Sequence, residues 1–190
     1  MMQKMKRDGL VLIAHNVRSA HNVGALFRTA DGAGVTKIFL TGYTPRPYVP
    51  KKNAVDDNRR YVTLTKAEKE LAKTALGAEM SMRWTRMTSV KKAFATLRRE
   101  KYTVVGLEQS ATSYDYREYA PVGPLALVVG NEVRGLDPAI LKQCDAIIAI
   151  PMRGTKNSLN VAVATGIALY QIANIMENNK RSNNEEYEKK

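Results

Sequence analysis

The sequence has few of the residues that form disulfides, metal sites or reactive thiols. Its 190 residues include one cysteine, Cys144, and two histidines. A single cysteine excludes an internal disulfide, and no Cys/His cluster has the spacing of a zinc site, so we predict no bound metal. We interpret Cys144 as a half-buried residue on a helix.

Three motifs common in nucleotide-binding and hydrolytic proteins are also missing. No G-x-G-x-x-G follows a predicted strand and no G-x-x-x-x-G-K-[ST] occurs, so ordinary dinucleotide and nucleoside-triphosphate sites have no support. No G-x-S-x-G occurs either. Neither His15 nor His21 has an evident nucleophile beside it, and we interpret His15 as a near-core residue and His21 as a loop residue.

No signal peptide is evident, because the basic start MMQKMKRDG is followed by only five apolar residues before His15. We therefore expect a cytoplasmic protein. Residues Leu159–Met176 carry no charge over 18 positions, about the lower limit for crossing a bilayer. Their Asn, Thr and Gln side chains favour a buried helix instead, covered by its own sheet and by a second subunit, so we predict a homodimer and no membrane contact.

Positive charge is abundant and localised. The chain has 30 Lys and Arg against 18 Asp and Glu, a net charge of +12, and residues 46–101 alone carry +9. Such a surplus favours a polyanionic partner, and nucleic acid is the preferred interpretation over a merely solvated face.

Apolar runs alternate with helical patterns along the chain. Strands are predicted at Leu10–His15, Lys37–Leu40, Met82–Met87, Thr103–Leu107, Leu125–Val129 and Ala146–Ile150. Helices are predicted at Val23–Ala33, Lys66–Leu76, Val90–Glu100, Pro138–Gln143 and Leu159–Glu177. Strands that are apolar throughout are covered on both faces, which predicts an α/β fold with a mainly parallel sheet and helices on both faces. We expect one domain over residues 1–176, a long loop over 43–60 and a polar, disordered tail over 177–190.

Polar residues follow three of the predicted strands, where ligands bind in open parallel sheets. The first segment is NVRSAHNVGALFRTA (Asn16–Ala30), in which we predict Asn22 to cap the helix, and Arg18 and Arg28 to bind a phosphate. The second is GNEVRGL (Gly130–Leu136), which places a carboxylate at a strand end. The third is IPMRGTKNSLNV (Ile150–Val161), in which Ser158 is the expected helix cap.

In order, spacing and position after strands, the three segments together resemble the SpoU/TrmH family of SPOUT RNA methyltransferases. The resemblance implies a C-terminal trefoil knot, a homodimer, S-adenosylmethionine as the methyl donor and a ribose 2′-hydroxyl of tRNA or rRNA as the acceptor. By position, the donor would contact Leu107, Gly130, Ile150, Met152, Ser158 and Leu159.

The resemblance also implies roles at the acceptor. Arg28 is the residue that the family assigns to activating the hydroxyl, and Glu132 would orient it through an ion pair. A guanidinium is effectively never deprotonated, so we interpret Arg28 as holding the ribose and its phosphate. Asn22, Ser158 and Asn160 would fix the nucleotide by hydrogen bonds. The predicted phosphate contacts are Arg18, Lys51, Lys52, Arg59 and Arg60.

Two alternatives stay open at this point. One is an RNA-binding protein of the same fold without catalysis, and the other is a methyltransferase that acts on a ring nitrogen of a base.

Overall fold

The computed structural model describes residues 9–49 and 64–188. Within them lies a seven-stranded sheet with the strand order β3-β2-β1-β6-β4-β7-β5, and every pair of neighbouring strands is parallel. The strands are β1 (Leu10–His15), β2 (Lys37–Thr41), β3 (Trp84–Met87), β4 (Thr103–Leu107), β5 (Tyr114–Asp115), β6 (Leu125–Val129) and β7 (Ala146–Ala149). The parallel sheet predicted from the sequence is confirmed.

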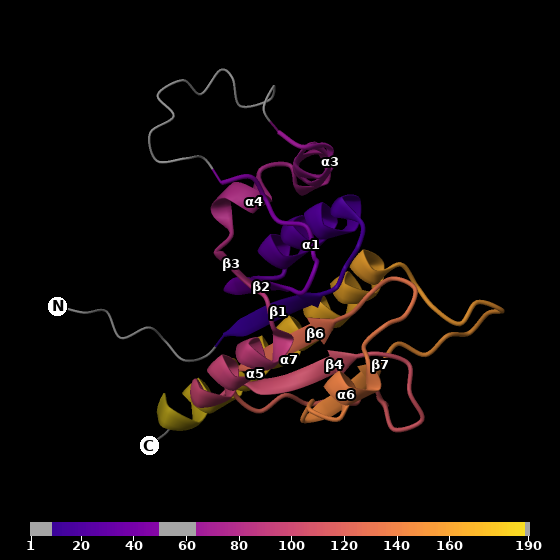
Figure 1. The fold of residues 1–190 in the computed structure, drawn as a ribbon. Coiled ribbons are helices and arrows are strands. Elements are labelled where there is room, and N and C mark those ends of the chain that lie inside the picture. The colour runs from indigo at the N-terminus through magenta and orange to yellow at the C-terminus, as the bar shows by residue number, and fades with distance from the viewer. Residues whose placement is uncertain (1–8, 50–63, 189–190) are drawn as a thin grey trace.

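Helices cover both faces of this sheet (Figure 1). They are α1 (Ala20–Gly32), α3 (Lys66–Ala75), α4 (Ala78–Ser81), α5 (Val90–Arg99), α6 (Pro138–Leu141) and α7 (Val161–Glu188). Helices α1 and α7 pack side by side on one face, and α3 packs on the outside of α1. Helix α5 covers the opposite face together with Ile140 of α6.

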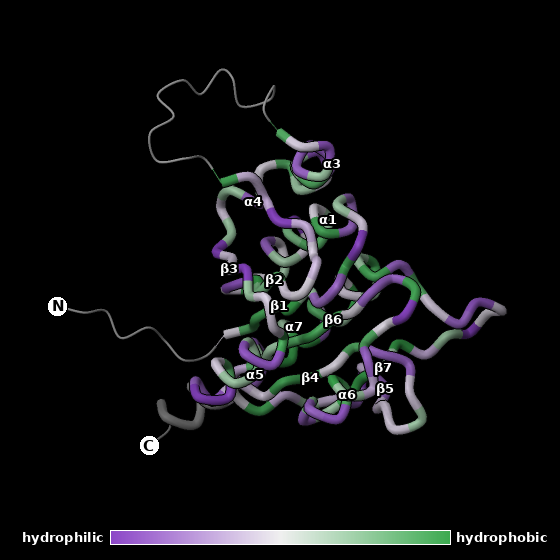
Figure 2. Tube along the Cα trace, viewed as in Figure 1, coloured by the Kyte–Doolittle hydropathy of each residue, from purple (hydrophilic) through white to green (hydrophobic). Residues whose placement is uncertain are grey.

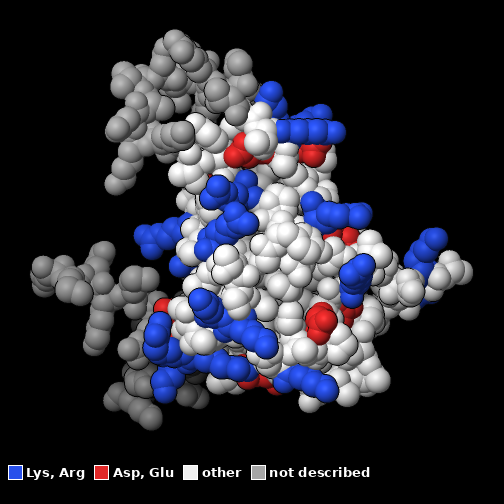
Figure 3. Space-filling view, viewed as in Figure 1, with Lys and Arg blue, Asp and Glu red and all other residues white. Residues whose placement is uncertain are grey.

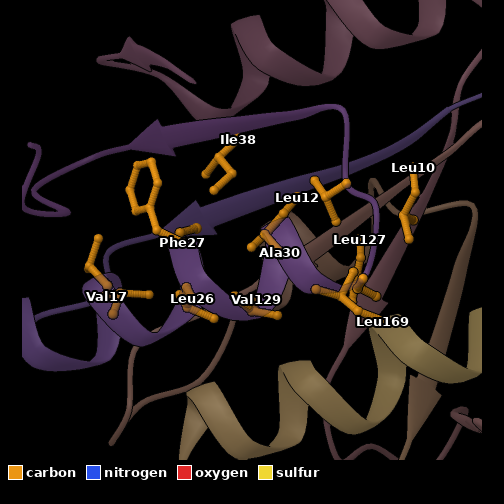
Figure 4. Packing of buried hydrophobic residues seen from close by; sticks show 14 of the residues in the cluster. Leu10, Leu12, Val17, Leu26, Phe27, Ala30, Ile38, Leu127, Val129 and Leu169 are labelled. Carbon is orange, nitrogen blue, oxygen red and sulfur yellow. The ribbon is translucent and has the colours of Figure 1, made fainter. Parts of the chain in front are cut away.

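The core has two parts because successive strand residues point to opposite faces. Leu12 belongs to the cluster beneath α1 and α7, with Phe27 and Leu169 (Figure 4). Its neighbour Ile13 belongs to the cluster beneath α5, with Phe94. All five residues of β6 are buried, and Figure 2 shows the central strands as mainly apolar. Each such fully buried Leu, Ile or Phe contributes about 1.5–3 kcal/mol.

The start of α1 differs from the prediction. The helix begins at Ala20, and its N-cap is Ser19, whose hydroxyl accepts a hydrogen bond from the amide of Asn22 at 3.3 Å. The predicted cap at Asn22 and start at Val23 are wrong, because the serine three residues earlier already satisfies that amide. The Asn22 side chain is thereby free for other contacts.

The long helix also starts and ends elsewhere. Asn160, and not the predicted Ser158, caps α7, since its Oδ1 accepts hydrogen bonds from the amides of Ala162 (2.9 Å) and Val163 (3.4 Å). The helix runs on to Glu188, eleven residues beyond the predicted end at Glu177. No glycine or proline occurs after residue 166, and Arg181 pairs with Glu177 one turn away, so nothing in the sequence stops the helix.

Two short elements, α4 and β5, are absent from the sequence prediction, because two to four residues are too few to establish a periodicity. Among the described residues, no helix, α7 included, has the length and apolar content needed to cross a bilayer.

Candidate active site at the carboxyl edge of the sheet

The segments that follow β1, β4, β6 and β7 converge at one edge of the sheet. In a parallel sheet all carboxyl ends lie at the same edge, and β1, β6, β4 and β7 are direct neighbours there. A cavity of about 310 Å³ opens at this edge, a volume at the lower end of the range for small-molecule sites.

The cavity is lined by all six residues that the family resemblance implies for the donor. Leu107 comes from the end of β4, Gly130 follows β6, and the other four come from the segment between β7 and α7. They are Ile150, Met152, Ser158 and Leu159. These residues are far apart in sequence but lie close together in the fold, because the strand order puts β4 between β6 and β7.

Gly130 allows the chain to turn back on itself beside the cavity. A Cβ at this position would lie 2.5 Å from the carbonyl carbon and oxygen of Gly135, a distance that real Cβ atoms do not show. The close approach is locked by two backbone hydrogen bonds between Asn131 and Gly135, at 3.1 and 2.9 Å. Residue 130 must therefore be glycine for the loop to keep this shape.

Glu132 sits between the cavity and the start of α1. Its carboxylate accepts hydrogen bonds from the backbone amides of Arg18 and Ser19, both at 2.9 Å. Burial pushes the pKa of Glu132 upward, but hydrogen bonds from these amides and from Asn22 outweigh burial and hold the pKa below its ordinary value. An ionised carboxylate thus lies at the positive end of α1, which the helix dipole favours.

A chain of side-chain hydrogen bonds joins the three sequence motifs. Asn22 donates from its amide nitrogen to Glu132 Oε1 at 2.9 Å, and its Oδ1 accepts from the amide nitrogen of Asn160 at 3.0 Å. These residues are separated by 110 and 138 positions along the chain. Asn22 and Asn160 carry this network because Ser19 caps α1 and because the Asn160 oxygen alone caps α7.

Arg28 is not among the residues that line this cavity. It is exposed on α1, beside a shallow hollow of about 590 Å³. The lining of this hollow, which we call the α1–α3–α7 hollow, comprises Ala25, Arg28, Thr29, Lys73, Thr74, Leu76 and Tyr170. The predicted Glu132–Arg28 pair is wrong within one chain, because the carboxylate is already held by amides of the α1 start.

Of the predicted phosphate contacts, the structure describes only Arg18. Its backbone amide binds Glu132 and the residue is exposed beside the start of α1. Lys51, Lys52, Arg59 and Arg60 lie outside the described residues.

Sequence reasoning misses several polar residues of the cavity, and Glu108 and Gln109 are the two that connect its walls. Glu108 accepts hydrogen bonds from the amides of Leu136 (2.8 Å) and Gln109 (3.0 Å), which ties the end of β4 to the second motif. The Gln109 amide donates to the carbonyl of Ile150 at 2.7 Å, which ties it to the third. Their position immediately after a predicted strand is the signal that could have identified them.

Comparison with known proteins gives a consistent result. Residues 58–170 match the model of the SpoU rRNA Methylase family. A Staphylococcus saprophyticus protein named for the TrmH family of tRNA/rRNA methyltransferases is 35% identical over 172 residues, covering 90% of this chain and 61% of its own length. The 23S rRNA (guanosine-2'-O-)-methyltransferase of Haemophilus influenzae is 34% identical over 168 residues, covering 88% and 60%.

A solved structure has the same fold. The rRNA methyltransferase of Sinorhizobium meliloti with bound AdoMet superposes with a TM-score of 0.70 at 28% identity, over 86% of this chain and 55% of that one. This chain thus spans about three fifths of the length of the curated relatives it matches. The family model covers more than half of the chain and includes the second and third motifs, so the chain belongs to the SpoU rRNA methylase family.

Proposed function

We propose that the protein transfers a methyl group from S-adenosylmethionine to a ribose 2′-hydroxyl of tRNA or rRNA. The observation that carries the proposal is the convergence of three distant motifs on one cavity through the Glu132–Asn22–Asn160 network. The H. influenzae relative is named as a ribose 2′-O-methyltransferase, and the S. meliloti relative is a methyltransferase with bound AdoMet.

The lining of the cavity fits a donor that is part apolar and part cationic. Leu107, Ile150 and Leu159 offer apolar surface, and backbone groups at Gly130 and around Ile150 offer hydrogen bonds. The carboxylates of Glu108 and Glu132 also line the cavity, so a bound cation would be favoured there. S-adenosylmethionine would supply a methyl group activated by a positively charged sulfur.

The polar network would hold the acceptor against the donor. The side chains of Asn22, Ser158 and Asn160 can position a ribose, and positioning alone contributes about 7–11 kcal/mol in well-aligned reactions. The guanidinium of Arg28 would hold the ribose and its adjoining phosphate, while the hydroxyl proton passes to a phosphate oxygen or to water.

Arg28 would perform this role at the cavity of a second subunit. Helix α7 exposes an apolar stripe of Val163 (53% exposed), Ile167 (37%) and Tyr170 (50%), spaced one turn apart. Tyr170 also borders the α1–α3–α7 hollow that contains Arg28. A second copy packed on this stripe would bury it and would bring its own cavity toward Arg28, which supports a homodimer.

Basic side chains supply a surface for RNA. Figure 3 shows Lys and Arg grouped over α5 and beside β3, with fewer Asp and Glu. The exposed basic residues there are Arg83, Arg86, Lys91, Lys92, Arg98 and Arg99. Lys51, Lys52, Arg59 and Arg60 remain proposed phosphate contacts, and the trefoil knot implied by the family remains part of the proposal. The cytoplasm remains the proposed location of the protein.

The test is a methylation assay with labelled S-adenosylmethionine and total tRNA or rRNA from cells that lack the protein. We expect label in RNA, and digestion to nucleosides should identify a 2′-O-methylnucleoside. A methylated base would contradict the ribose assignment, and donor or RNA binding without transfer would contradict catalysis. Activity should also fall steeply with salt, because RNA binding by Lys and Arg releases counterions.

A further inference from the structure

Tyr43, two residues after the end of β2, is an exposed aromatic residue whose side chain and backbone are both held by hydrogen bonds. The residue is 58% exposed, although its hydroxyl and its backbone amide are each hydrogen-bonded to a different segment. An aromatic residue that is more than half exposed gains little from burial, so the hydrogen bonds that fix Tyr43 call for an explanation beyond packing.

The hydroxyl of Tyr43 is held by Asn131 of the second motif, a residue that lines the cavity. The amide nitrogen of Asn131 donates to the Tyr43 hydroxyl and to the Asn16 carbonyl, both at 3.1 Å. Its oxygen accepts from the amides of Val133 and Arg134, both at 2.9 Å. With these four hydrogen bonds Asn131 has a fixed orientation, and the ring of Tyr43 stands one side chain away from the cavity.

The backbone of Tyr43 is held by two residues in unusual conformations. Its amide donates to Asn16 Oδ1 at 3.2 Å, and Asn16 has a left-handed backbone with φ of 55°. Gly42 has φ of 66°, and a Cβ there would lie 1.9 Å from the same Asn16 oxygen. Left-handed non-glycine residues cost free energy and concentrate at functional sites.

Thr44, the residue after Tyr43, is also held firmly in place. The hydroxyl of Thr44 is buried, donates to the carbonyls of Ala14 (3.0 Å) and Thr41 (2.9 Å), and accepts from the amide of Val17 at 3.1 Å. Tyr43 is therefore flanked by Gly42 and Thr44, whose geometries are both fixed by β1 and the segment after it.

We propose that the ring of Tyr43 is a stacking platform for a nucleobase of the RNA, next to the ribose held at the cavity. This inference rests on the proposed function and adds a base-binding site to it. Unpaired bases of RNA bind proteins by stacking on aromatic rings, and a ring already fixed in place loses little conformational entropy on binding. Stacking accepts any base, so the platform contributes affinity rather than sequence choice.

The test compares Tyr43→Leu with Tyr43→Phe in methylation assays on tRNA or rRNA from cells that lack the protein. Leucine keeps an apolar side chain without a flat face, whereas phenylalanine keeps the face and loses the bond to Asn131. We expect Tyr43→Leu to raise the KM for RNA by about 5- to 100-fold. Tyr43→Phe should stay within a few-fold of the native protein, and the Kd for S-adenosylmethionine should not change in either variant.

Tyr114→Leu is the matched control, because Tyr114 is 60% exposed but lies on β5 at the far edge of the sheet. It should leave the KM for RNA unchanged, and melting temperatures should verify that all three variants fold. Equal KM values for Tyr43→Leu and the native protein would overturn the platform while leaving the proposed function intact. Equal losses in Tyr43→Phe and Tyr43→Leu would also overturn it, since the hydroxyl would then matter and not the ring. If the native protein methylates no RNA, the proposed function fails and the platform fails with it.

Discussion

The cavity at the carboxyl edge and the α1–α3–α7 hollow lie on the same chain but are built in opposite ways. At the cavity, the carboxylates of Glu132 and Glu108 accept hydrogen bonds from backbone amides, and Glu132 accepts one more from the Asn22 side chain. In the hollow, Arg28 is exposed, and none of the ion pairs found among the described residues involves it. One site is organised by its own chain, and the other presents a cation without a fixed partner.

The contrast separates two requirements of the proposed reaction. Donor binding needs preorganised groups, which the strand order supplies within one subunit. Holding the acceptor ribose would need Arg28 at that same place, and in a single chain Arg28 lies in the hollow and does not line the cavity. A change at Arg28 should therefore impair methyl transfer and leave donor binding intact.

The largest expected effect comes from Arg28→Ala. Removing the cation that would hold the ribose and its phosphate should lower kcat by about 10²–10³-fold. Donor affinity should stay within twofold of the native value, because Arg28 does not line the donor cavity. Steady-state kinetics together with calorimetric titration of S-adenosylmethionine would measure both, and a loss of donor binding would contradict the separation.

Mixed dimers sharpen this prediction. A dimer of one Arg28→Ala subunit and one cavity-defective subunit has an intact cavity and an intact Arg28 only on different chains. Activity regained on mixing two inactive variants would support action across the subunit boundary. Mixtures that stay inactive would show that Arg28 does not act there.

The second effect is on the cavity itself and comes from Gly130→Ala. The new Cβ would collide with backbone atoms of Gly135 and Leu136, which cannot move aside as a flexible side chain could. We expect a loss of about 1–3 kcal/mol in stability and a donor affinity at least about tenfold lower.

Gly154→Ala is the matched control in the third motif. Apart from its two neighbours in the chain, no described residue has an atom within 4 Å of the Cβ that it would introduce, and its φ is not in the left-handed range. The variant should bind the donor like the native protein. Equal donor affinities for the two alanine variants would show that the close approach at Gly130 does not shape the site.

The same contrast explains what the sequence could predict. The strands and their parallel order follow from apolar runs such as LVLIAH and LALVV, which need cover on both faces. The edge at which the cavity lies follows because ligands bind at the carboxyl ends of parallel strands, whereas the residues expected to contact the donor follow only from the family resemblance. The partners of Glu132 do not follow, because a carboxylate can pair with a guanidinium or with amides, and only the packing of α1 against the second motif decides between them.

Helix ends were predictable only in part, for a related reason. Four side chains in the motifs are able to cap a helix: those of Ser19, Asn22, Ser158 and Asn160. The sequence does not show which of them make other hydrogen bonds in the site instead. The end of α7 is governed by local propensity, and the polar composition of residues 177–188 says little against a helix.

The third effect concerns the proposed subunit interface on α7, which would bring the cavity of one subunit to the hollow of the other. Ile167→Glu places a carboxylate in the exposed stripe of α7, and burying it without a partner should weaken the proposed dimer by at least about tenfold. Light scattering across a concentration series would measure the shift toward monomer. Val122→Glu is the control, since Val122 is 90% exposed on another segment and should leave association unchanged. If the two variants associate equally, α7 is not the interface.

The smallest effect is a pH dependence of the free energy of unfolding, which we expect from His15, the neighbour in sequence of Asn16. Burial lowers the pKa of His15 from its ordinary value of 6.5, and the negative charge of Asp137 opposes this only in part. The ring bonds Thr41 Oγ1 through Nδ1 at 2.9 Å and Asn16 through Nε2 at 3.1 Å. The folded protein therefore resists protonation of His15 more than the unfolded chain does.

The sign of this effect is fixed. As pH falls through 6.5, the unfolded chain takes up a proton before the folded protein does, so the free energy of unfolding decreases until the lowered pKa is passed. Urea unfolding between pH 8 and 5 should show a steeper decrease for the native protein than for His15→Gln, with His21 present in both. Asp137→Asn should steepen the native dependence, because it removes the opposing charge while asparagine keeps the α6 cap. Parallel curves for native and His15→Gln proteins would contradict this prediction. They would mean that His15 has the same pKa in the folded and the unfolded protein.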